Sequence, residues 1–118
     1  FPYTTLFRSV LISALTRVEV ASALARWVRA GEIDERQANR VDAAFHEDLA
    51  SGRFRLHPIE PERYERATHW LLARTTSLRT VDALHLACAE ADGAVLVTLD
   101  RQLADAADYL GIATLEPS

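Results

Sequence analysis

The sequence predicts an α/β domain in which a mostly parallel β-sheet is covered by helices on both faces. Short apolar segments of strand length alternate along the chain with segments whose apolar residues recur at helical spacing. The segment at residues 94–98 (Ala-Val-Leu-Val-Thr) has the continuous apolar composition that is typical of a strand buried on both faces. With 118 residues, the chain is long enough for one domain with a hydrophobic core.

The first half of the chain is predicted to hold two strands and two helices. In order, they are a strand at 10–12, a helix at 15–30, a helix at 34–50 and a strand at 54–56 that can extend to 59. Either Ser13 or Thr16 offers an N-cap for the first helix, and Gly31 is expected just after its C-terminus. Asp34 is the expected N-cap of the second helix.

The second half is predicted to continue the alternation. In order, its elements are a helix at 61–75, a helix at 80–91, a strand at 94–98, a helix at 100–110 and a strand at 112–115. Pro61 suits a first helical position, where its missing N–H costs nothing. Gly93 and Gly111 are expected to end two of these helices, and Asp100 is expected to begin the last one.

Composition narrows the possible functions. No apolar run approaches membrane-spanning length and nothing reads as a signal peptide, so we expect a cytoplasmic protein with no membrane partner. The only cysteine, Cys88, cannot form an internal disulfide and is expected to be a buried thiol. The net charge of −4 argues against a protein that coats nucleic acid, but not against an enzyme that holds RNA through a few arginines and a cation. With four glycines and no Gly-rich loop, an unrelated phosphate-binding domain is disfavoured.

The first nine residues, Phe1 to Ser9, differ in character from the rest of the chain. They contain no acidic residue, continue no helical period, and match the translation of the end of a common short-read sequencing adapter. We therefore expect residues 1–9 to be artefactual and residues 10–118 to form the domain. The alternative is a natural edge strand, because residues 3–7 have good β propensity.

Three acidic residues occupy related positions in this predicted fold. Glu19 lies in the first turns of the helix after the first strand, Asp82 in the first turn of the helix near 80, and Asp100 directly after the strand at 94–98. Functional groups of open parallel sheets gather at the carboxyl ends of the strands. Carboxylates brought together there would repel one another without a cation, and their hard oxygen atoms suit Mg²⁺ or Mn²⁺.

Each acid also has a structural explanation. Thr16 and Glu19 have the spacing of a capping box, Asp100 is a good N-cap, and Asp82 would favour the positive end of a helix dipole. Spacing alone does not decide between these roles and a shared site.

Three segments carry a family resemblance. They are Ser13 to Val20 (SALTRVEV), Leu78 to Ala87 (LRTVDALHLA) and Val97 to Leu103 (VTLDRQL) with the alanine-rich stretch that follows. In order and spacing they resemble the segments around the second, third and fourth acids of PIN-domain ribonucleases of the VapC toxin type, over about residues 10–118. The resemblance implies a three-layer α/β/α sandwich and a Mg²⁺- or Mn²⁺-dependent endoribonuclease that is held in check by a cognate antitoxin.

By this resemblance, Glu19, Asp82 and Asp100 are the catalytic metal ligands. Thr98 and Arg79 are weaker candidates for supporting the site, Thr98 by bonding an acid or a metal-bound water and Arg79 by contacting phosphate or an acid. The resemblance also implies a homodimer. His85 is expected to be packed or hydrogen-bonded rather than a catalytic base.

The chain departs from the family pattern at its start. The family's first acid lies on an N-terminal strand, and nothing in residues 1–9 supplies it. The first strand is therefore expected to be missing or replaced. The alternative function is a truncated, catalytically inactive PIN-like module that retains only dimer or antitoxin binding.

Overall fold

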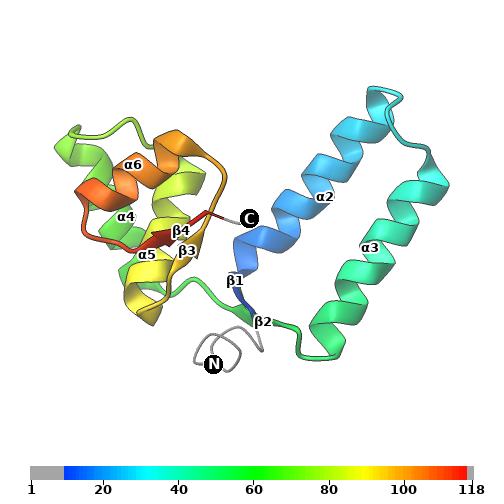
Figure 1. Cartoon of the computed structure of the whole chain (residues 1–118), viewed down its shortest axis with the longest axis horizontal. Coiled ribbons are helices and arrows are strands. Elements are labelled where there is room, and N and C mark those ends of the chain that lie inside the picture. Colours follow the sequence, from blue (N-terminus) through cyan, green and yellow to red (C-terminus); the bar gives the residue numbers. More distant parts are fainter. Residues whose placement is uncertain (1–9, 117–118) are drawn as a thin grey trace. The chain divides into compact units, whose positions relative to one another are not determined.

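The computed structural model describes residues 10–116, with side chains from residue 11 onward (Figure 1). The elements in chain order are β1 (Val10–Ser13), α2 (Ala14–Arg29), α3 (Glu35–Ala50), β2 (Phe54–His57), α4 (Pro61–Ala73), α5 (Thr80–Asp92), β3 (Leu96–Val97), α6 (Arg101–Tyr109) and β4 (Thr114–Leu115). The chain divides after Pro58 into two compact units. The predictions for residues 1–9 lie outside the described residues, and a single domain over 10–118 stays a prediction.

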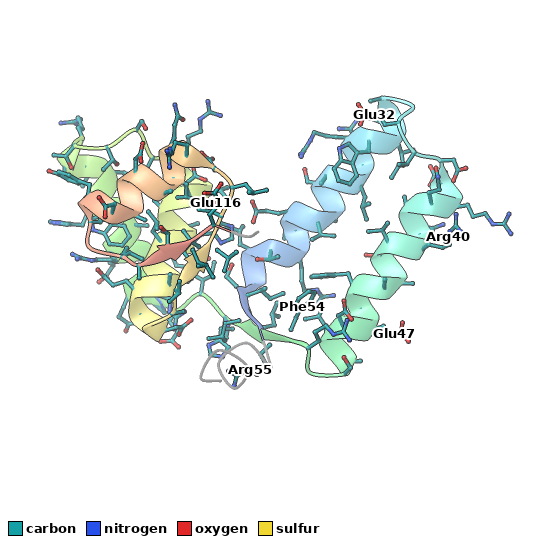
Figure 2. All side chains as sticks on the ribbon, viewed as in Figure 1. Glu32, Arg40, Glu47, Phe54, Arg55 and Glu116 are labelled. Carbon is teal, nitrogen blue, oxygen red and sulfur yellow. The ribbon has the colours of Figure 1, made fainter. Side chains whose placement is uncertain are left out.

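The first unit is a parallel strand pair joined by a helical hairpin. β1 and β2 pair in parallel with Val10 opposite Phe54 and Ser13 opposite His57, and the connection between them runs through α2 and α3 (Figure 1). Figure 2 shows Phe54 at the base of this hairpin, where its ring lies 5.8 Å from the ring of Phe45 on α3, between centroids. Aromatic contacts of this kind anchor α3 to the strand that follows it.

The second unit is built around the packing of α4 against α5. Its most buried side chains come from these two helices and from α6. They are Ala67, Trp70, Ala83, Leu86, Ala87, Ala106 and Ala107. Small alanine side chains on α5 and α6 let neighbouring helices approach closely, and the larger Trp70 fills the remaining space. β3 and β4 pair in parallel, with Leu96 opposite Thr114.

The predicted α/β class with parallel strands is confirmed, and most helix ends lie within two residues of the predicted ones. The described strands form two separate parallel pairs, β1–β2 and β3–β4. None of the helices within residues 10–116 is long and apolar enough to cross a membrane.

The predicted helix ends have a clear physical basis. The backbone of Gly31 adopts φ +75°, its N–H donates to the Val28 carbonyl, and the Glu32 N–H donates to the Trp27 carbonyl. This is the Schellman pattern, which requires a left-handed residue and therefore favours glycine. Gly111 ends α6 in the same way, with φ +78°.

Some predictions need correction. The strand predicted at 94–98 is limited to Leu96–Val97, and it is not fully buried, because Val95 and Val97 are 46% and 48% exposed. Helix α4 ends at Ala73 rather than at Thr75, because Arg74 takes the left-handed conformation with φ 57°. Pairing with β4 covers one edge of the strand, whereas burial of its side chains depends on what packs on its faces, so its apolar composition overstated its burial.

The N-terminus of α3 leads to a stability prediction. The Asp34 side chain accepts a hydrogen bond from the Gln37 N–H at 2.7 Å, and the Gln37 side chain accepts one from the Asp34 N–H at 2.9 Å. This capping box satisfies two backbone donors at once. We expect Asp34→Ala to lower the free energy of unfolding by about 1 kcal/mol, measured by urea denaturation.

The matched control is Asp105→Ala. Asp105 is exposed in the middle of α6 and caps no helix. We expect this change to alter stability by less than about 0.5 kcal/mol. An equal loss in both variants would contradict a capping role for Asp34.

Candidate active site

Glu19 lies in the second turn of α2 and is half-buried. The N-cap of α2 is Ser13, so Thr16 is the third residue of the helix rather than its cap. The capping-box explanation of Glu19 is therefore wrong. Because its carboxylate does not close the helix N-terminus, Glu19 keeps its candidacy as a ligand.

Asp82 is the third residue of α5 and is half-buried. It is the one acidic residue in the first turn of that helix, where the positive end of the helix dipole favours a negative charge. Asp82 therefore has the position in which the helix dipole stabilises its charge. An interaction with the dipole still leaves the carboxylate oxygens available as ligands. Arg79 is the N-cap residue of the same helix, is exposed, and makes no side-chain capping bond.

Asp100 is the N-cap of α6, as its structural explanation required. Its Oδ1 accepts hydrogen bonds from the backbone N–H groups of Gln102 at 3.0 Å and Leu103 at 3.2 Å. The Asp100 N–H in turn donates to the Thr98 Oγ1 at 3.0 Å. These three bonds fix the Asp100 backbone and one carboxylate oxygen, so capping and a ligand role for Oδ2 are compatible.

The three acids belong to two different units of the structure. Asp82 and Asp100 belong to the second unit, and Glu19 belongs to the first. No group of three or more acidic, histidine or cysteine residues that could hold a metal ion occurs within residues 10–116. The oxygen donors have the right chemistry for Mg²⁺ or Mn²⁺, and their assembly into one centre stays a prediction.

The remaining candidates are one groove and several other side chains. A groove between α2 and α3 is lined by none of the three acids. His85 is half-buried and interacts with a neighbouring group, in agreement with a packed or hydrogen-bonded role. Trp70 is 5% exposed and belongs to the core, whereas Trp27 is 45% exposed. Cys88 is buried, as predicted.

A buried ion pair that no sequence signal predicted holds α4 to α5. The Arg63 guanidinium donates two hydrogen bonds to the Asp92 carboxylate, at 2.7 and 3.1 Å, and Arg63 is only 8% exposed. The hydrogen bonds to Asp92 are the main cause that raises the pKa of Arg63 above its ordinary value, and Cys88 also raises it. Desolvation by burial lowers the pKa and opposes this shift. Arg63 therefore stays protonated wherever the protein is folded.

A second, exposed pair lies on the same two helices. Arg66 donates to Glu90 at 2.8 and 3.2 Å, and its guanidinium carbon lies 4.9 Å from the ring centroid of Trp70. The bond to Glu90 raises the pKa of Arg66. Both pairs join residues more than twenty positions apart, so spacing within one helix could not reveal them.

Comparison with known families identifies this arrangement. Residues 5–109 match the family described as PIN domain, and this range includes all three acids. A separate comparison with individual curated proteins finds no match. The family match covers most of the chain and is consistent with the α/β fold and the parallel strands described above.

Proposed function

The chain belongs to the PIN domain family, and on this premise we propose that it is a metal-dependent endoribonuclease, the toxin component of a toxin–antitoxin pair. PIN domains are typically metal-dependent nucleases that act on nucleic acid. Under this proposal the substrate is RNA, and the partners are a cognate antitoxin and a second copy of the chain. The site of action is the cytoplasm.

One observation carries the proposal. The family match contains Glu19, Asp82 and Asp100, each near the N-terminus of its helix, and Glu19 and Asp100 each follow a parallel-paired strand. In α/β folds, this end of the strands is where functional groups are placed. Glu19 is not part of a capping box, because α2 begins at Ser13. Asp100 caps α6 through its Oδ1 atom, so capping does not use Oδ2.

Each residue has a defined part in the proposed reaction. Glu19, Asp82 and the Oδ2 atom of Asp100 would hold Mg²⁺ or Mn²⁺. The bound cation would supply an activated water and offset the charge that builds on the phosphodiester. Thr98 holds the backbone of Asp100, which keeps that carboxylate at the start of α6. In the net reaction, water adds across a P–O bond of RNA and the chain is cut.

A second candidate is an inactive PIN-like module that binds only a dimer partner or an antitoxin. The observation that favours it is the absence of Asp and Glu from residues 1–9, where the resemblance calls for a first acid. Fewer carboxylates would weaken the hold on a divalent cation.

The test is RNA cleavage by the purified chain. We expect cleavage of a fluorescent RNA with Mn²⁺ or Mg²⁺ and none after addition of EDTA, because the cation would supply the activated water. DNA of the same sequence tests the RNA assignment, and we expect it to stay intact. Product lengths on a denaturing gel provide the measurement. The same assay is repeated with the chain extended by the coding sequence that lies upstream of Val10 in source DNA.

The outcomes separate the two candidates. Cleavage by the extended chain alone assigns the inactive module to the present chain and the nuclease to the extended one. If neither protein cuts RNA, or if EDTA leaves cleavage unchanged, the nuclease proposal is wrong.

A further inference from the structure

The hydroxyl of Ser13 is buried without a partner. Ser13 is 6% exposed, and its Oγ is the one buried side-chain polar atom within the described residues that has no hydrogen bond. Ser13 is the N-cap of α2, where a serine Oγ ordinarily accepts a bond from a first-turn N–H, yet it makes no such bond here. A buried polar group without a partner destabilises the fold, and a bound ligand would satisfy it.

The surroundings of Ser13 favour an anionic ligand. The first N–H groups of a helix have no carbonyl partner within the helix, and the helix dipole places partial positive charge there. Helix α2 has 16 residues, and its first turn contains no acidic side chain that could supply the missing negative charge. Ser13 lies opposite His57 in the β1–β2 register, so both side chains lie on the same face of the strand pair.

A row of polar side chains leads from this point to the proposed catalytic acid. Thr16 and Glu19 follow Ser13 at intervals of three residues, and both are half-buried. Residues spaced in this way form one ridge of a helix surface, and side chains tilt toward the helix N-terminus. A group bound at Ser13 would therefore lie on the same ridge as the Glu19 carboxylate.

We propose that the N-terminus of α2 and the Ser13 Oγ bind a phosphate group of the RNA backbone beside Glu19. The Ser13 hydroxyl donates to a phosphate oxygen, and the first-turn amides of α2 donate to the same group. The identity of the phosphate as part of RNA rests on the proposed function, whereas the anion site itself rests only on residues of the first unit.

The first arm of the test uses inorganic phosphate in the presence of EDTA. We expect phosphate to raise the thermal unfolding midpoint of the whole chain relative to chloride of equal ionic strength. Ser13→Ala should abolish this rise, and in chloride it should unfold at the same or a higher temperature, because it removes an unpartnered hydroxyl. Ser22→Ala is the matched control, because Ser22 is exposed on the same helix and its Oγ accepts from Arg26.

A second variant tests the same site even if Ser13→Ala fails to fold. Thr16→Asp places a carboxylate in the first turn of α2, where it can accept from the same amides. It should raise the midpoint in chloride and remove the response to phosphate. A phosphate response that persists in both Ser13→Ala and Thr16→Asp, or that is absent from the parent chain, would overturn the proposal.

The second arm uses a non-cleavable 2′-O-methyl RNA, again with EDTA, and measures binding by fluorescence anisotropy. We expect Ser13→Ala to weaken binding by about tenfold, as for the loss of one hydrogen bond to a charged group, with Ser22→Ala unchanged. If phosphate stabilises the chain but Ser13→Ala and Ser22→Ala bind RNA equally well, the site binds free phosphate and the RNA assignment is wrong. If the chain binds phosphate as expected but does not cleave RNA, the proposed function is wrong and the phosphate site is unaffected.

Discussion

Asp82→Asn is expected to lower the rate of RNA cleavage by about 100-fold or more, in whichever form of the chain is active. The amide keeps the size and shape of the side chain but carries no negative charge, so it binds a divalent cation far more weakly. Asp82 is half-buried in the first turn of α5 and caps nothing, so the helix should form normally. Cleavage rates at several Mn²⁺ concentrations provide the measurement.

The matched control is Asp105→Asn on α6. This change also replaces one carboxylate by an amide, but Asp105 is exposed and lies outside the first turn of its helix. We expect its cleavage rate to equal that of the parent chain. If Asp82→Asn cleaves as fast as Asp105→Asn, Asp82 is not a ligand of the catalytic cation.

Arg63→Ala should produce the largest loss of stability, about 3–5 kcal/mol in the free energy of unfolding. The substitution leaves the Asp92 carboxylate, whose side chain is 15% exposed, without the guanidinium that neutralises it. A largely buried charge that loses its bidentate ion-pair partner is costly, so the packing of α4 on α5 should weaken. Urea denaturation followed by circular dichroism measures the change.

The comparison is with Arg66→Ala, which removes the neighbouring exposed pair. The side chains of Arg66 and Glu90 are 45% and 37% exposed, so water already screens their attraction. We expect a loss of about 1 kcal/mol, which includes the contact with Trp70. The double change Arg63→Met with Asp92→Leu should recover much of the loss. Equal losses for Arg63→Ala and Arg66→Ala would show that burial does not determine the strength of these pairs.

Local sequence signals predicted the helix boundaries well. Asp34 and Gly31 act through hydrogen bonds to residues within five positions, and glycine is the residue that most readily adopts φ +75°. The same locality explains why Asp100 was predicted as an N-cap. The N-cap of α2 was ambiguous, because Ser13 and Thr16 both carry a capping hydroxyl and only the structure shows which one begins the helix.

Properties that depend on distant neighbours were less predictable. The strand at 94–98 has the composition of a buried strand, but its exposure depends on which elements cover it. Trp27 and Trp70 both lie on helices, yet Trp27 is 45% exposed and Trp70 only 5%. For the candidate site, the family resemblance supplied the acids, while the unpartnered Ser13 hydroxyl became visible only in three dimensions.

The burial of Cys88 gives the chain a reporter of its own motions. It is the only thiol, it lies on α5, and it is 7% exposed beside Arg63. A thiol reagent in solution reaches a buried sulfur when the packing around α5 opens, either by local opening or by global unfolding. The rate of chemical labelling at Cys88 therefore reports how often this helix pair opens, with no engineered probe and no competing cysteine.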